Sequence, residues 1–458
     1  MPDASSAVSR EERTAQPSGI VRLFKAQNIT PVWLLLLAAL VGVLAGLVAT
    51  LFEYGVHQVL AWRANGISLW SESGWPRWLL AALSSGVMAG LAIWLTYRFA
   101  PEAAGSGIPE IEGAMDNIRP LPWWRVLPVK LVGGFLALGG GLVLGSGGPA
   151  TQMGAHVGRM IADICRLTKD NAHMLLATGA AGGLSAAFNA PLAGVMLVVE
   201  EMRPQFRYNL ISVKCVLMGA ILANIVFRAF HSQDAIIEMP SYAPPALASL
   251  WLFLLLGFLF GAFGIFFNKA IQAAQDGYSQ LHGDNMARRV ALVAAMGALM
   301  GWLTVDMPAL TGSGVDLIPN ITVGSFTVAT LALLCLGRLL TTLICFGANL
   351  PGGIFAPMLT LGTLFGMGFG QLVSAAFPQW GLEPGTFAIA GMGALFAATV
   401  RAPLTGIILV IEMTDNYLLI LPLLLTCLGA TMVAQALGGQ PLYAQLLKRM
   451  LERERAKA

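Results

Sequence analysis

The sequence predicts an all-helical protein that crosses a membrane many times and contains broken helices. Its composition is the first reason, because 56% of the 458 residues are hydrophobic, 11% are charged and the mean hydropathy is +0.71. Ordinary soluble domains carry about 25% charged residues. The second reason is the 52 glycines, which favour close helix packing in a membrane. The third is that long apolar runs alternate with short ones interrupted by proline.

The ends of the chain predict its orientation. Residues 1–30 are polar and contain no apolar core followed by a cleavage site, so we expect no removable signal peptide. Cations precede the first apolar run and follow the last, which predicts that both termini lie in the cytoplasm. They are Arg10, Arg13, Arg22 and Lys25 at the start, and Lys448, Arg449, Arg453, Arg455 and Lys457 at the end.

Three apolar runs, 31–54, 78–97 and 249–267, are each long enough to span the hydrocarbon layer. Two shorter runs, 174–188 and 192–199, are separated by Asn189 and Pro191. A half-span of this kind is tolerated in a membrane only when protein surrounds it.

An internal repeat accounts for these half-spans. Residues 179–200 align without gaps on residues 391–412, with 9 identities in 22 positions. The tripeptide Gly-Ser-Gly at 105–107 recurs at 312–314. Equivalent broken helices of such repeats meet near the bilayer midplane in many transporters. We predict a membrane repeat at 31–230, an extracytoplasmic loop at 231–246, a second repeat at 247–440 and a cytoplasmic tail at 441–458, with the relative direction of the copies left open.

Three motifs predict helix starts inside apolar segments: GSGIPE at 105–110, GSGGP at 145–149 and PGGIFAP at 351–357. The first amides of a helix have no partner within it, and the aligned peptide dipoles place a partial positive charge there. Several such ends meeting at one point would bind an anion without a buried lysine, which would slow its release. A packing notch is the alternative for any single motif.

The composition gives little reason to expect that the protein binds a metal, a cofactor or nucleic acid. The five cysteines, Cys165, Cys215, Cys335, Cys345 and Cys427, are scattered singly, which favours small core residues over metal ligands or redox thiols. We therefore expect no metal and no cofactor. A net charge of +3 is too small to indicate nucleic-acid binding.

On these motifs the chain resembles the CLC family of chloride channels and chloride/proton antiporters, and its bacterial antiporter branch most closely. The resemblance extends over about residues 30–447 and is carried by GSGIPEIEGA, FNAPLAG, EEMRPQFR, PGGIFAPML and RAPLTGIILVIEMTDN. It implies a homodimer in the bacterial inner membrane, two inverted halves in each subunit and a separate chloride path in each subunit. No CBS domains are expected after the last helix.

Site residues follow from the resemblance by position in these motifs. It implies that Ser106 offers its hydroxyl to a central chloride ion, Ile354 and Phe355 offer amides, and Tyr443 offers its phenol. The start of the GSGGP helix would add Gly147 and Gly148. These are the predicted chloride-binding residues.

One departure from the family pattern concerns the gate. The family motif GREGP reads GSGGP here, so Ser146 replaces an arginine and Gly147 replaces the gating glutamate. In the family that glutamate blocks the anion path as a carboxylate and leaves it when protonated. Since glycine can neither occlude the path nor carry a proton, we predict an uncoupled, channel-like passage.

Alternatives remain open at this stage. Glu201 sits where the family places its inner proton-transfer glutamate, so chloride/proton exchange could survive through Glu201 and a further group; the alternative for Glu201 is a solvated carboxylate. Glu200 recurs as Glu412 in the repeat, which favours a structural role. His156 is nine residues beyond Gly147 and is interpreted as a packing histidine. An intramembrane hydrolase is a remote reading, because no GxSG motif occurs.

Overall fold

The computed structural model describes residues 31–202 and 209–455. The predicted N-terminal segment 1–30, with its four cations, and Lys457 lie outside the described residues, as does most of EEMRPQFR. Over the described ranges the chain forms helices joined by short turns and contains no strand, which confirms the predicted all-helical class.

The helices are α2 (Val32–Glu72), α3 (Arg77–Phe99), α4 (Ile108–Met115), α5 (Trp123–Gly139), α6 (Gly147–Ile164), α7 (Lys169–Phe188), α8 (Pro191–Glu200), α9 (Leu210–Phe230), α10 (Leu250–His282), α11 (Met286–Asp306), α12 (Leu317–Val323), α13 (Val328–Gly347), α14 (Phe355–Ala376), α15 (Pro384–Val400), α16 (Pro403–Thr414), α17 (Ile420–Ala436) and α18 (Leu442–Arg455). Among the described segments, eight are long and apolar enough to cross a membrane; they contain α2, α3, α9, α10, α11, α13, α14 and α17.

Two of the predicted spans are parts of longer helices. The run 31–54 belongs to α2, which continues to Glu72, and the run 249–267 belongs to α10, which continues to His282. Hydropathy marks the apolar part of a helix, whereas a helix ends where its backbone finds a stop signal such as glycine or proline. α2 ends just before Gly74 and Pro76, and α10 ends at Gly283 in the left-handed conformation.

The predicted half-spans are present in both repeats. α7 ends at Asn189 with φ +48°, and Pro191 then begins α8. In the second half α15 ends at Arg401 with φ +72°, and Pro403 begins α16. A left-handed residue followed by a first-turn proline therefore breaks the helix at the same place in each copy.

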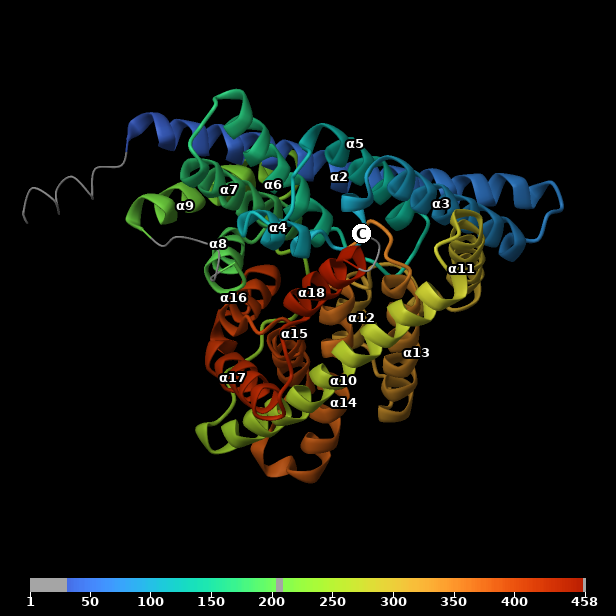
Figure 1. Cartoon of the computed structure of the whole chain (residues 1–458). Helices are drawn as coiled ribbons and strands as arrows, with labels where there is room; N and C mark the ends of the chain where they lie inside the picture. The colour runs from blue at the N-terminus through green and yellow to red at the C-terminus, as the bar shows by residue number, and fades with distance from the viewer. Residues whose placement is uncertain (1–30, 203–208, 456–458) are drawn as a thin grey trace, which may run out of the picture.

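The two halves lie side by side, with α2 to α9 in one and α10 to α17 in the other, and α18 runs between them (Figure 1). In the first half α6 packs on α7, and in the second α14 packs on α15. A Cβ added at Gly154 would lie 2.1 Å from the carbonyl oxygen of Gly179, and one at Gly362 would lie 2.3 Å from that of Gly391. Each contact requires glycine at both positions. Both copies of the repeat therefore keep this close packing between two helices.

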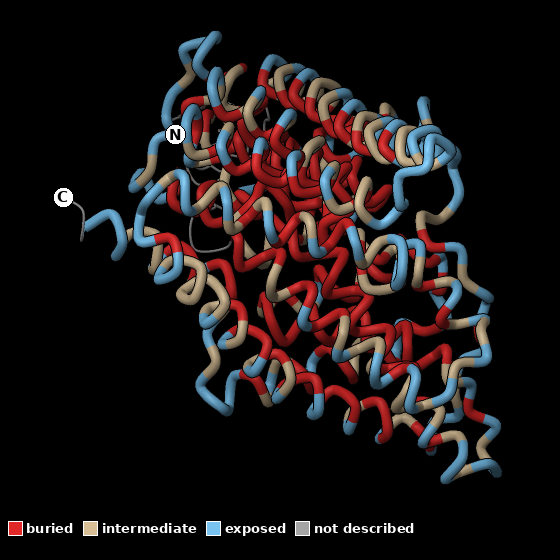
Figure 2. Tube along the Cα trace, turned by 90° about the vertical axis from the view of Figure 1, so that its right-hand side faces the viewer, coloured by how far each residue is buried: buried red, intermediate tan, exposed pale blue. Residues whose placement is uncertain are grey.

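Burial separates the interior of the bundle from its lipid-facing surface (Figure 2). Both α7 and α15 are apolar on all sides, and nearly every residue of each is buried. Exposed large apolar side chains lie on the outer helices instead, including Leu36, Trp62 and Leu333. This distribution is typical of a helical membrane protein, in which hydrocarbon replaces water around the outer helices.

The broken helices α8 and α16 lie next to each other (Figure 1). Each supplies a carboxylate that caps the other. The Glu412 carboxylate accepts hydrogen bonds from the amides of Leu192 (3.1 Å) and Ala193 (2.9 Å) at the start of α8. In return, Glu200 accepts from the amides of Leu404 (3.0 Å) and Thr405 (2.6 Å) at the start of α16. The prediction of a structural role for Glu200 and Glu412 is confirmed.

Removing one of these caps should destabilise the protein. In the Glu412→Ala variant two first-turn amides lose their acceptor, which costs about 1 kcal/mol of unfolding free energy. The apparent melting temperature in detergent should therefore fall, whereas the exposed Glu72→Ala variant on α2 should melt like the parent. Equal melting temperatures for all three proteins would contradict the capping role.

Candidate functional site

The helices α6 and α14 begin side by side in the interior. Just before them, the Gly145 amide donates to the Gly353 carbonyl (2.8 Å) and the Gly353 amide donates to the Gly145 carbonyl (2.7 Å). The first-turn amides that follow have no acceptor among the hydrogen bonds of the described chain; they belong to Gly147 and Gly148 in α6 and to Phe355 and Ala356 in α14. Two positive helix ends are therefore held next to each other with free donors.

The third predicted helix start, that of α4, also lies here. Gly107 precedes α4 with φ +86°, a conformation that favours glycine. A Cβ added at Gly148 would lie 2.9 Å from the Ser106 carbonyl oxygen and 3.1 Å from the Ser106 Cβ. Glycine at 148 thus allows Ser106 to contact the first turn of α6.

A buried ammonium group binds the loop that carries Ser106. Lys130 is 0% exposed, and its Nζ donates to the carbonyls of Ala103 (3.0 Å) and Gly105 (2.7 Å). In the second half, Arg338 is 1% exposed and its Nη1 donates to the carbonyls of Thr311 (2.8 Å) and Gly312 (2.9 Å). Each copy therefore has one buried cation bound to its Gly-Ser-Gly loop.

Two buried hydroxyl groups at this place have no partner among the described residues. Ser106 is 2% exposed and Tyr443 is 0% exposed, yet neither Oγ nor Oη makes a hydrogen bond there. The Tyr443 ring lies 6.2 Å from that of Phe355 at the start of α14. A buried hydroxyl without a partner is costly, so both groups point to a ligand between them and the helix ends.

The Tyr443 hydroxyl is a neutral donor. Burial first, and then the nearby carboxyl groups of Glu201 and Glu112, raise the pKa of the Tyr443 hydroxyl well above its usual range. A neutral phenol can donate its one hydrogen bond to an anion.

An aromatic ring occupies the place that a side chain at position 147 would take. A Cβ added at Gly147 would lie 2.3 Å from the Phe188 ring and 3.4 Å from that of Phe355. The two rings make an edge contact with centroids 5.9 Å apart. Sequence reasoning missed Phe188, although the FNAPLAG motif places it directly before the break between α7 and α8.

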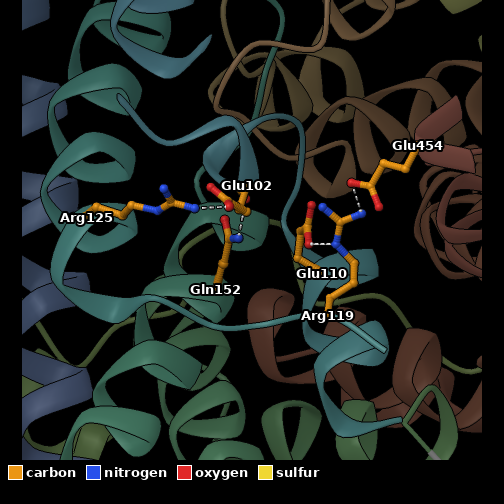
Figure 3. A network of polar contacts seen from close by, with 6 residues as sticks. All are labelled: Glu102, Glu110, Arg119, Arg125, Gln152 and Glu454. Carbon is orange, nitrogen blue, oxygen red and sulfur yellow. Dashed lines mark hydrogen bonds and ion pairs between the residues drawn. The ribbon is translucent and has the colours of Figure 1, made fainter. Parts of the chain in front are cut away.

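A cavity of about 620 Å³ leads from Ser106 toward the C-terminal helix α18. Its wall carries ion pairs, shown in Figure 3: Arg119 contacts Glu110 (2.5 Å) and Glu454 (2.8 Å). In the same network Arg125 contacts Glu102, whose carbonyl accepts from Gln152. This cavity therefore connects α18 with the loop that carries Ser106.

The predicted inner glutamate belongs to a carboxyl pair. The side chains of Glu201 and Glu112 are joined by a hydrogen bond. Both expectations for Glu201, proton transfer and a solvated carboxylate, remain predictions.

Several other expectations can be compared with the structure. His156 is buried and its Nδ1 lies 2.8 Å from the Gln152 carbonyl oxygen, so the packing interpretation is confirmed. Cys165 is exposed rather than a core residue, since it lies just after the end of α6.

The six predicted anion residues, Ser106, Gly147, Gly148, Ile354, Phe355 and Tyr443, thus lie around the starts of α4, α6 and α14. Ile354 is the N-terminal flanking residue of α14, and its carbonyl accepts from the Met358 amide (3.0 Å). Their role as chloride ligands remains a prediction.

Comparisons with known proteins agree with this architecture. Residues 88–435 match the family described as Voltage gated chloride channel. The H(+)/Cl(-) exchange transporter ClcA of Vibrio parahaemolyticus is 58% identical over 440 residues, covering 96% of this chain and 94% of the relative. The ClcA of Cronobacter sakazakii is 52% identical over 449 residues, covering 98% and 96%.

Two solved structures extend the comparison. A slow cyanobacterial Cl-/H+ antiporter superposes with a TM-score of 0.88 at 43% identity, covering 92% of this chain and 99% of the other. A eukaryotic CLC transporter superposes with a TM-score of 0.75 at 24% identity, covering 90% and 73%, and it shows the fold alone.

Removing the Tyr443 hydroxyl should cost anion affinity and no stability. The Tyr443→Phe variant loses a group without a protein partner, so its melting temperature should equal or exceed that of the parent. A hydrogen bond to a charged group is worth about 1.5–3 kcal/mol, so halide affinity should fall by about tenfold or more. Calorimetric titration of the purified protein with chloride measures this, with the exposed Tyr417→Phe as control. Unchanged affinity would remove Tyr443 from the site.

Proposed function

Because this chain belongs to the voltage gated chloride channel family, we propose that it carries chloride and similar anions across the bacterial inner membrane at the starts of α4, α6 and α14. The observation that carries the proposal is the pair of unpartnered buried hydroxyls, Ser106 and Tyr443, beside free first-turn amides. Amides and hydroxyls hold an anion through partial charges, which permits both binding and release. Lys130 adds positive potential from behind the loop without occupying the site.

We further propose that this transport is exchange of chloride against protons. The two bacterial relatives at 58% and 52% identity are named H(+)/Cl(-) exchange transporters. The carboxyl groups of Glu112 and Glu201 support the same reading, because they lie close to each other and to Tyr443. A proton and an anion would then be bound close together.

Uncoupled, channel-like passage is the second candidate, and Gly147 favours it. The start of α6 offers no carboxylate, and Phe188 fills the space where a side chain at that position would lie. Exchange at a fixed ratio requires that a proton and an anion compete for one mobile group. If no residue supplies that group, anions pass without proton counterflow.

The proposed assembly is a homodimer with both termini in the cytoplasm. Exposed apolar side chains on α9 and α17, including Ile221, Ile225, Leu421 and Leu428, would be buried by a second copy. The cations at the end of α18, Arg449 and Arg453, support a cytoplasmic C-terminus through the positive-inside rule.

Flux from liposomes separates the two modes of transport. Exchange predicts that an outward chloride gradient drives protons inward against their own gradient, as read by an external pH electrode. In the Glu201→Gln variant proton movement should stop while chloride efflux continues, and Glu72→Gln should behave like the parent. Chloride efflux that needs a potassium ionophore, without proton movement in the parent, would replace exchange by uncoupled passage.

Restoring a glutamate at position 147 should make chloride flux depend on acid. In the Gly147→Glu variant a carboxylate would compete with the anion above its pKa and leave once protonated, so efflux should be slow at neutral pH and rise as the pH falls. The variant should also melt at a lower temperature, because Phe188 has to move. The Gly147→Gln variant, which cannot ionise, should show no added pH dependence. Identical pH profiles for Gly147→Glu and the parent would place position 147 away from the path.

A further inference from the structure

The helices α3 and α11 leave a groove between them on the exposed side of the bundle. Both helices are long and apolar enough to cross a membrane, and they pack against each other. The groove has a volume of about 500 Å³, and every residue that lines it is apolar. Exposed side chains such as Leu91 and Trp94 form one wall. Small residues lie where the helices approach closely: Gly86, Gly90, Ala294 and Ala298.

The two helices run in opposite directions along this groove. A Cβ added at Gly301 would lie 2.2 Å from the Ala81 carbonyl oxygen, and one added at Gly90 would lie 3.6 Å from the Val290 side chain. The end of α3 therefore lies beside the start of α11. Each of these two ends carries an exposed cation, Arg98 on α3 and Arg288 on α11. The positive-inside rule predicts that this end of the groove faces the cytoplasm.

Helical periodicity puts these two residues, the groove arginines, on the faces that line the groove. Arg98 follows Trp94 by four residues, which is about one turn. Arg288 precedes Ala295 by seven residues, which is about two turns. Within residues 31–202 and 209–455, neither arginine forms an ion pair with a carboxylate. Their charges can therefore act on a ligand in the groove.

Other charged groups at this end contact one another. Arg289 lies over the Tyr97 ring at 3.9 Å, and its guanidinium is 3.5 Å from the Asp284 carboxylate. The Glu102 carboxylate, which follows the end of α3, contacts Arg125. These two carboxylates each have a cationic partner, so the charge that the groove arginines add to this end is positive.

The groove arginines lie at the depth of lipid headgroups. Met88 is the middle residue of α3, and Arg98 lies ten residues further on, which is about 15 Å along the axis. The hydrocarbon layer is about 30 Å thick, so one leaflet contributes about 15 Å. The groove itself extends from Ala82 to Trp94, about 18 Å. It therefore covers about the depth of one leaflet and ends near cations at the membrane surface.

We propose that the groove binds an acyl chain of an acidic phospholipid from the cytoplasmic leaflet, and that Arg98 and Arg288 contact the phosphate of its headgroup. The apolar lining accepts a hydrocarbon chain and offers nothing to a soluble anion. Guanidinium groups suit phosphate oxygens, and each cation near the membrane surface favours an anionic lipid. This lipid site is separate from the starts of α4, α6 and α14, so it holds for either mode of transport.

The site can be tested by native mass spectrometry of the purified full chain in detergent, titrated with dioleoyl phosphatidylglycerol or dioleoyl phosphatidylcholine. The parent should bind the acidic lipid severalfold more tightly than the neutral one. Arg98→Gln and Arg288→Gln should each weaken phosphatidylglycerol binding about fivefold, as expected for the loss of one cation near the surface. Phosphatidylcholine binding should not change. Arg77→Gln, which removes an exposed arginine at the other end of α3, should match the parent.

A second pair of variants tests the groove itself. Ala295→Phe places a ring in the groove from an exposed position and should weaken binding of both lipids severalfold. Ala262→Phe, at an exposed position of α10 outside the groove, should bind both lipids like the parent. The arginine variants and the alanine variants are independent, so either set decides if a sample of the other does not fold.

Equal affinity of the parent for the two lipids would overturn the proposal. Unchanged phosphatidylglycerol binding in both arginine variants, or in Ala295→Phe, would overturn it as well. The same spectra report the oligomeric state. If Ala295→Phe changed that state and left lipid binding intact, a second copy of the chain would be the occupant of the groove, and the lipid site would be excluded. The assay needs no chloride flux, so its outcome is independent of the proposed transport.

Discussion

The first turn of a helix inside a membrane must find negative charge for its free amides, and the broken helices of this protein meet that constraint in two ways. At α8 and α16 the negative charge comes from the protein, because Glu412 and Glu200 each accept two amide hydrogen bonds. At α6 and α14 no such carboxylate is supplied, and the described amides remain free. The capped ends hold the two halves together, and the free ends are available for a mobile anion.

The two halves of the chain share one scaffold, and the candidate site lies where the halves differ. Lys130 and Arg338 each bind the carbonyl of the first glycine in their Gly-Ser-Gly loop. Only the first loop places its serine against a free helix end, since Ser106 contacts Gly148 and is buried while Ser313 is half-buried. The single C-terminal helix then adds Tyr443, which has no counterpart in the other half. The candidate site is therefore asymmetric, although it is built on a repeated scaffold.

The Glu112 and Glu201 carboxyl groups lie on elements other than α6 and α14. Both carboxyl groups act on the Tyr443 hydroxyl of α18. At position 147 itself, Phe188 takes the space of a side chain. A protein arranged in this way couples protons to anions only if groups outside α6 change the anion's energy when they titrate. The proposals of exchange and of uncoupled passage therefore use the same helix ends and differ in whether such groups take up protons.

The sequence by itself determined the membrane class, the repeat, the broken helices and the three helix starts. Hydropathy, proline and glycine act within a few residues, so the starts of α4, α6 and α14 could be predicted from local pattern. Family motifs then indicated Ser106, Tyr443 and Glu201. Only the tertiary structure decided which residues meet: Phe188 beside Gly147, and Glu112 beside Glu201. These partners lie tens of residues apart, and contacts at such separation depend on helix packing, which no local pattern encodes.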